Sequence, residues 1–159
     1  MLYACNYDII LITETWLCNE ITNGLLDPSM HYKVIRKDRA HSKGGGVCAF
    51  VNKRWHVIST SIDAKFDDCE VVCFDCLGSS NHVRVRCFVV YRPPLYDHVA
   101  AHNMRCIIDC LASYMNPRNT NIIVGDFNLP KINWKTLSCP SDNFHKPFLS
   151  FLLSPAAPS

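Results

Sequence analysis

The sequence has no apolar run long enough to cross a membrane and no recognisable secretory leader. The apolar stretch Ile9–Ile12 follows Asp8 and soon meets Glu14, whereas a membrane helix needs roughly 20 consecutive apolar residues. A signal peptide would also begin with basic residues, and none precedes this stretch. We therefore expect an intracellular protein without a membrane partner, in either the nucleus or the cytoplasm.

An excess of one charge is also missing, because 16 Lys and Arg residues oppose 14 Asp and Glu residues and leave a net charge of +2. Nucleic-acid binding is indicated by a strong basic field, so this small charge neither supports nor excludes it. The 159 residues contain no internal repeat and are expected to form one domain. We place it at residues 1–150 and expect residues 151–159 to be a disordered tail or a truncated end.

Ten cysteines are present, but neither disulfides nor a zinc site are expected from them. Thiols stay reduced inside cells, and the C-x-x-C formed by Cys73 and Cys76 lacks the second pair that a zinc site usually has. Residues three apart on a strand also point to opposite faces, so we expect small buried hydrophobic side chains.

Another set of possible metal ligands recurs at every fourth residue: His98, His102, Cys106 and Cys110. On a helix the set spans about 18 Å, so its members cannot bind one ion. We expect a stripe that faces solvent.

The residue pattern predicts many strands and one long helix. The predicted strands cover residues 8–13, 32–36, 46–52, 55–60, 69–76, 83–92 and 121–127, and the predicted helix covers 97–115, with Asp97 as a possible N-cap. We interpret "NKRW" and "GSSNH" as hairpin connections, "SKGGGV" as a flexible turn and "NIIVGDF" as a fully buried strand. This order favours an α/β or α+β sandwich.

Polar side chains follow two of the apolar strands. Glu14 comes after one, and Asp126 and Asn128 come after another, at the strand ends where layered α/β folds usually present ligand-binding groups. Carboxylates there suit Mg²⁺, and Asn128 or the Tyr91 hydroxyl can bind a phosphate oxygen. Two structural alternatives stay open, because Asp126 could simply start a turn and Glu14 could cap a helix that begins near Thr15.

The motifs "DIILITETWL", "RKDR…GGGV", "VYRPP" and "GDFNLPKINW" resemble the endonuclease/exonuclease/phosphatase superfamily. More narrowly, they resemble the apurinic-type endonuclease domain of non-LTR, LINE-like retrotransposons, which is associated with a reverse transcriptase. The resemblance extends in order from about Asp8 to Trp134. It implies a deoxyribonuclease-like four-layer α/β/β/α sandwich that hydrolyses phosphodiester bonds of DNA with Mg²⁺ or Mn²⁺ and without a small-molecule cofactor.

The resemblance also implies roles for four residues. Glu14 matches the metal-binding glutamate, and Tyr91 matches the tyrosine that contacts the scissile phosphate. Asp126 matches the aspartate that orients the attacking water or assists the leaving group, and Asn128 matches the asparagine that holds the phosphate. Glu70 also has a counterpart in relatives, but we assign it no catalytic role.

The sequence departs from the family pattern at both ends. Relatives begin with another strand that carries a metal-site asparagine, and they end with strands that carry an aspartate and a Ser-Asp-His motif. "SDN" at Ser141–Asn143 is not that motif, because it has no histidine in third place and follows "GDFN" too closely, and His145 is a poor substitute. Residues that act as one catalytic unit are each needed for most of the rate.

We therefore expect a DNA-nicking endonuclease by family whose activity is absent or low in this chain. The alternative is a retrotransposon remnant or a nucleic-acid-binding module without catalysis. A phosphatase that acts on an inositol lipid or a nucleotide is a third reading, since one fold hosts several substrates, but the "ETWL" and "YRPP" motifs argue against it. The oligomeric state is not indicated by the sequence.

Overall fold

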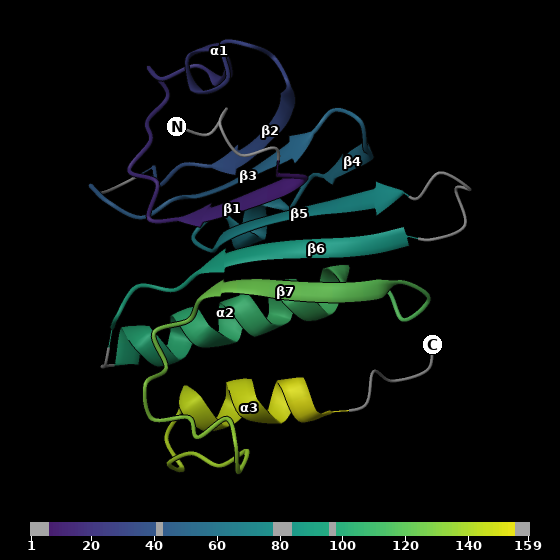
Figure 1. The fold of residues 1–159 in the computed structure, drawn as a ribbon. Helices are drawn as coiled ribbons and strands as arrows, with labels where there is room; N and C mark the ends of the chain where they lie inside the picture. Colours follow the sequence, from purple (N-terminus) through teal and green to yellow (C-terminus); the bar gives the residue numbers. More distant parts are fainter. Residues whose placement is uncertain (1–6, 41–42, 78–83, 96–97, 155–159) are drawn as a thin grey trace.

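The computed structural model describes residues 7–40, 43–77, 84–95 and 98–154, which form two β-sheets with helices on the outer faces (Figure 1). The strands are β1 (Ile9–Thr13), β2 (Tyr32–Lys37), β3 (Val47–Asn52), β4 (His56–Thr60), β5 (Glu70–Leu77), β6 (Arg84–Tyr91) and β7 (Thr120–Asp126). The helices are α1 (Asn23–Leu26), α2 (His98–Tyr114) and α3 (His145–Leu153), and a 3₁₀ turn, η2, covers Ala64–Phe66. The strands and the long helix match the predicted ranges to within one residue at each end.

The first sheet has the strand order β1-β3-β2 and is antiparallel. The second has the order β4-β5-β6-β7, in which only β6 and β7 run parallel. A parallel pair needs a long crossover, and α2 provides it. The predicted α/β sandwich is confirmed.

Apolar side chains fill the space between the layers. Val47, Ala49 and Val51 of β3 pack between the sheets against Phe74 and Val89 of the second sheet. The other face of the second sheet packs on α2, and α3 packs beyond it against α2 and the loop after β7. The outer face of the first sheet carries a smaller cluster beside α1.

Of the two predicted hairpins, the one at "NKRW" is wrong and the one between β5 and β6 is confirmed. "NKRW" is not a hairpin connection, because it leads from β3 in the first sheet to β4 in the second. Strand periodicity describes single strands and does not reveal which sheet each one joins. The antiparallel pairing of β5 with β6 confirms the second hairpin, although "GSSNH" itself, like the proposed N-cap Asp97, lies outside the described residues.

The prediction that "NIIVGDF" is fully buried is wrong. β7 lies at the edge of the second sheet, and only Ile123 packs against the α2 side. Ile122 and Val124 point the other way and are 43% and 41% exposed. An apolar run is typical of a strand covered on both faces, but here the described residues cover only one.

The solvent-facing stripe on α2 is only half confirmed. His98 and His102 are exposed, whereas Cys106 is half-buried and Cys110 is fully buried. At 3.6 residues per turn, each step of four residues rotates a position by about 40° around the helix. Three steps therefore carry the set from solvent into the core, next to Cys69.

The helix α3 was not predicted, and the predicted domain boundary after residue 150 falls inside it. Pro147 lies in the first turn of this helix, where proline is tolerated because its missing N–H has no partner to lose. Of the proposed tail at residues 151–159, residues 151–153 belong to α3, and residues 155–159 lie outside the described part of the chain. None of the helices in that part is long and apolar enough to cross a membrane.

Candidate active site

Three of the four candidate residues come from strands that end on the same side of the sandwich (Figure 1). Glu14 follows β1, Tyr91 is the last residue of β6, and Asp126 is the last residue of β7. Tyr91 and Asp126 are register partners in the second sheet, and β1 lies over β6 and β7. The fold thus brings together side chains that are up to 112 positions apart, from residue 14 to residue 126.

The Glu14 carboxylate is exposed and held by two donors. The Tyr91 hydroxyl donates to Oε1 at 2.7 Å, and Nε1 of Trp16 donates to Oε2 at 3.1 Å. The bond from Tyr91 and then that from Trp16 lower the pKa of Glu14 below its usual value. Burial and the bond to this carboxylate raise the pKa of Tyr91 to about 12, so the phenol stays a donor at neutral pH.

The segment after β1 is irregular backbone and the first helix begins only at Asn23, so the alternative that Glu14 caps a helix near Thr15 is wrong. Glu14 and Trp16 both have φ of 54°, in the left-handed region that non-glycine residues rarely adopt. The glycine loop, Gly44 to Gly46, fixes this segment, because the N–H of Trp16 donates to the Gly45 carbonyl at 2.9 Å. Strained backbone of this kind is common at functional sites.

Glu70 and Arg39 support the glycine loop, because Glu70 bonds to both Arg39 and the backbone of Gly46. The Glu70 carboxylate is 7% exposed and accepts from Nε of Arg39 at 2.8 Å and from the Gly46 N–H. Arg39 also lies over the Tyr91 ring, 5.7 Å from its centroid. Sequence reasoning assigned Glu70 no catalytic role and missed its contacts with Arg39 and the glycine loop. The "RKDR…GGGV" motif was the available signal.

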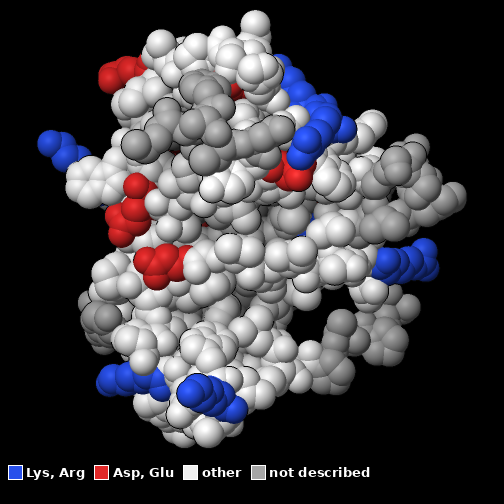
Figure 2. Space-filling model, in the orientation of Figure 1, with Lys and Arg blue, Asp and Glu red and all other residues white. Residues whose placement is uncertain are grey.

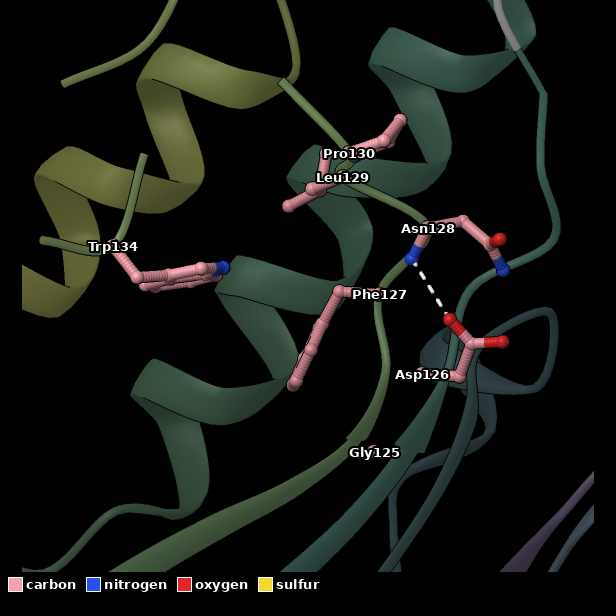
Figure 3. Close-up of a pocket in the computed structure, with 7 residues that line it drawn as sticks. All are labelled: Gly125, Asp126, Phe127, Asn128, Leu129, Pro130 and Trp134. Atoms are coloured by element: carbon pink, nitrogen blue, oxygen red, sulfur yellow. Dashed lines mark hydrogen bonds between the residues drawn. The ribbon is translucent and has the colours of Figure 1, made fainter. Parts of the chain in front are cut away.

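Asp126 and Asn128 lie on the same side of the backbone, opposite Phe127 (Figure 3). Asn128 N–H donates to Oδ1 of Asp126 at 3.1 Å, so Asp126 does start a turn, as the structural alternative had it. Asn128 has φ of 49°, and its Nδ2 donates to the Arg92 carbonyl at 2.7 Å. Strand alternation does not bring the two side chains together, because β7 ends at Asp126. The turn does.

Arg92 ties this turn to the end of β6. Its N–H donates to the Asp126 carbonyl at 2.9 Å, and its fully buried guanidinium donates to the Leu95 carbonyl at 2.9 Å. The guanidinium also lies 5.1 Å from the centre of the Phe144 ring. All four candidate residues therefore contact or belong to the dipeptide Tyr91–Arg92.

An aspartate–histidine pair exists, but its histidine lies inside the protein and its aspartate is only partly exposed. Nδ1 of His145 is 2.6 Å from Oδ2 of Asp142, and the His145 side chain is fully buried. Asp142 also accepts from the backbone N–H groups of Phe144 and His145 at 3.2 and 2.7 Å, so it caps the start of α3. In this arrangement the His145 ring has almost no contact with solvent.

Acidic side chains gather where β1, β6 and β7 end, at the left of the face in Figure 2. Such a surface repels phosphate unless a cation is present. Among the described residues, no group of three or more His, Cys, Asp and Glu side chains could hold a metal ion. The oxygens of Glu14 suit a hard cation that takes its remaining ligands from water and phosphate, and they do not suit a closed protein cage.

No protein-family model matches the sequence, and no curated protein matches it either. Solved structures do match. An AP endonuclease from Archaeoglobus fulgidus aligns with a TM-score of 0.62 and 14% identity, over 91% of this chain and 59% of that chain. The 3′ phosphatase NExo from Neisseria, bound to a product DNA hairpin, aligns with a TM-score of 0.63 and 17% identity, over 95% of this chain and 62% of that chain.

These likenesses are at the level of the fold. The chain spans less than two thirds of the length of either structure. The chain therefore has a mixed α/β fold of the deoxyribonuclease-like type, as these two structures do.

Proposed function

We propose that the end of the sandwich bearing Glu14, Tyr91, Asp126 and Asn128 is a phosphodiester-binding site of the DNA-nicking type. The observation that supports this most strongly is the convergence of all four on Tyr91–Arg92. A loop that merely connects two elements would not need the positive φ angles of Glu14 and Trp16 or the partly buried ion pair of Arg39 and Glu70 beside it. The fold of two DNA-processing proteins adds independent support.

Mg²⁺ or Mn²⁺ is the proposed cofactor, with Glu14 as its protein ligand. Its carboxylate is exposed, oriented by two donors and kept anionic by a lowered pKa. When bound, the cation would neutralise charge that develops on the phosphate oxygens. Tyr91 is only 3% exposed, and its hydroxyl is already used by Glu14, so its proposed role shifts from phosphate contact to holding the carboxylate.

Asp126 and Asn128 are the proposed catalytic pair. The Asp126 carboxylate is exposed and can orient an attacking water or accept its proton. Asn128 is held by its bond to Arg92 and is placed to fix a phosphate oxygen. The turn that joins the two residues keeps both side chains at one phosphate.

Low nicking activity is expected from this chain, because the described residues place no histidine beside Asp126. The one aspartate–histidine contact among them joins the partly exposed Asp142 to the fully buried His145. Binding without efficient cleavage is therefore part of the proposal. The second candidate, a non-catalytic module or remnant of a retrotransposon, is favoured by the same observation.

Conversion of supercoiled plasmid to nicked circles in Mg²⁺ tests this function, with Asp126→Ala as the variant. We expect slow nicking that Asp126→Ala reduces further, together with DNA binding that the variant retains. Rapid nicking that Asp126→Ala abolishes would refute the low activity. Rapid nicking that survives this substitution, or no DNA binding at all, would refute the site itself.

The cellular context is also proposed. All nine cysteines of the described residues are free thiols, in keeping with an intracellular protein. The retrotransposon origin rests on the sequence motifs alone. A Ser-Asp-His motif and a reverse transcriptase reading frame downstream in the genomic sequence would support it, and unrelated flanking sequence would contradict it.

A further inference from the structure

The loop that follows the candidate site is a fixed structure. Asn133 and Ser138 exchange two backbone hydrogen bonds, of 2.8 and 3.2 Å. Within the turn that they close, Oδ1 of Asn133 accepts from the N–H groups of Lys135 and Thr136 at 3.0 and 3.1 Å. The position of Trp134, inside this turn, is therefore set by the backbone.

The same loop is anchored in the core on one side only. Leu129 and Ile132 are 7% and 6% exposed and pack with Met104 and Phe148 between α2 and α3. Trp134, two residues after Ile132, is 55% exposed. A single exposed apolar side chain is common on protein surfaces, so the role of Trp134 depends on what lies beside it.

Trp134 shares a pocket with the candidate catalytic residues. The pocket is an open hollow of about 420 Å³ along the loop from Gly125 to Pro130, with Trp134 also in its lining. In Figure 3 the Trp134 ring lies on the Phe127 side of the loop, and the side chains of Asp126 and Asn128 point to the other side. A strand that crosses the loop from a phosphate at Asn128 would therefore meet the Trp134 ring beyond Phe127.

The charge around Trp134 favours a polyanion. Lys131 and Lys135 lie on either side of it in sequence and are exposed, and residues 129–141 contain no acidic side chain. Figure 2 shows basic side chains on the lower edge of the face, where Figure 1 places this loop and α3. Aromatic side chains flanked by cations are typical of surfaces that stack the bases of single-stranded nucleic acid.

We propose that Trp134 is a stacking platform for an unstacked DNA base next to the phosphate bound at Asn128, with Lys131 and Lys135 contacting the flanking backbone. This inference rests on the proposed function and adds a substrate feature to it, namely a strand with at least one base free of its stack. It makes Trp134 a positioning residue for the substrate and gives it no chemical role.

The experiment uses two probes of equal length, a single-stranded oligonucleotide and the same deoxyribose-phosphate strand without bases. We expect Trp134→Ala to weaken binding of the first by about tenfold, within the range that alanine substitution gives for base stacking. Binding of the abasic strand should not change, and Trp134→Phe should restore most of the affinity for the normal strand. Trp55→Ala is the matched control, because Trp55 lies at the start of β4 and contacts Asp8.

Fluorescence supplies a second readout in the double variant Trp16→Phe/Trp55→Phe, in which Trp134 is the only tryptophan. Its emission should be quenched by the normal strand, with the dissociation constant that anisotropy gives, and not by the abasic strand. Equal losses on both probes in Trp134→Ala, or binding without quenching, would overturn the stacking role while leaving the phosphate site intact. Failure of the wild-type chain to bind either probe would overturn both proposals, and binding of a protein partner alone would replace this one.

Discussion

At the scale of single residues, the candidate site depends on one buried tyrosine. The Tyr91 hydroxyl, in the second sheet, donates a hydrogen bond to Glu14, which follows β1 of the first sheet. The Tyr91 backbone lies beside Asp126. A hydrogen bond to the charged form of a carboxyl group favours ionisation. Tyr91 therefore sets both the direction and the charge of the proposed metal ligand.

Replacing Tyr91 with Phe should raise the pKa of Glu14, because the bond from Tyr91 is the largest cause of its lowering. Trp16→Phe removes the second donor and should raise it less. The pKa can be followed by NMR titration of the side-chain carboxyl carbon. Equal shifts, or a larger shift in Trp16→Phe, would contradict the assigned contacts.

Gly125 is the second residue on which the site depends, since it precedes Asp126 with no room for a side chain. A Cβ atom there would overlap the backbone carbonyl of Val90 on β6. We expect Gly125→Ala to reduce the free energy of unfolding by about 1–3 kcal/mol, the usual range for overpacking.

The matched control for Gly125→Ala is Gly24→Ala, in the helix α1, where a Cβ would meet only a Thr22 atom at 3.9 Å. Alanine is favoured over glycine in a helix, so this variant should be neutral or slightly more stable. Urea unfolding measures both variants. Equal stabilities would show that β6 and β7 are not so closely apposed.

At the scale of elements, α3 is held at its start by the pair of Asp142 and His145. Partial burial would raise the pKa of Asp142, but hydrogen bonds from the backbone and ring of His145 and from Phe144 N–H together lower it. A carboxyl group with a lowered folded pKa contributes stability above its unfolded pKa, which has a model-compound value of 3.8. That contribution disappears as the pH falls through the folded pKa.

Asp142→Asn should therefore lower stability at pH 7 and flatten its loss on acidification below about pH 4, near the ordinary pKa of Asp. Asparagine can still accept hydrogen bonds from the backbone N–H groups at the start of α3. The variant therefore tests the negative charge separately from these hydrogen bonds. Urea unfolding from pH 7 down to pH 3 makes the comparison. Parallel stability curves for wild type and variant would contradict the assigned pair.

The elements themselves were largely predictable, and their partners were not. Apolar periodicity located all seven described strands because each one covers part of a core. Periodicity could not show that β4 joins the second sheet or that the Val124 side chain stays exposed, since both depend on where distant segments pack. Asp126 and Asn128 lie two positions apart within "GDFN", so the sequence alone could place them together. Glu70 and Arg39 lie 31 positions apart and meet only in the folded chain.

At the scale of the whole molecule, the second sheet ends in an exposed strand. β7 is an edge strand, and Ile122 and Val124 present apolar surface beside its unpaired backbone groups. Edges of this kind promote pairing between molecules unless a charge or a covering element blocks them.

Val124→Lys should reduce self-association as the concentration is raised, with a change in unfolding free energy within about 0.5 kcal/mol, as for most surface positions. Light scattering across a dilution series measures this. Leu25→Lys, on α1, removes a similarly exposed apolar side chain away from any strand and should have little effect. Equal improvement by both variants would point to general surface apolarity instead of the β7 edge.

We propose that Glu14 and Asp126 together form one cation-assisted phosphate site. Its most direct test is the affinity of the chain for a DNA oligonucleotide, measured by fluorescence anisotropy in Mg²⁺ and in EDTA at equal ionic strength. Wild type should bind more tightly in Mg²⁺, by a factor within the roughly 5- to 150-fold range of coupled ligands, and Glu14→Gln should lose this difference. Equal affinity of the wild type in both buffers, or a Mg²⁺ effect that survives Glu14→Gln, would contradict the account.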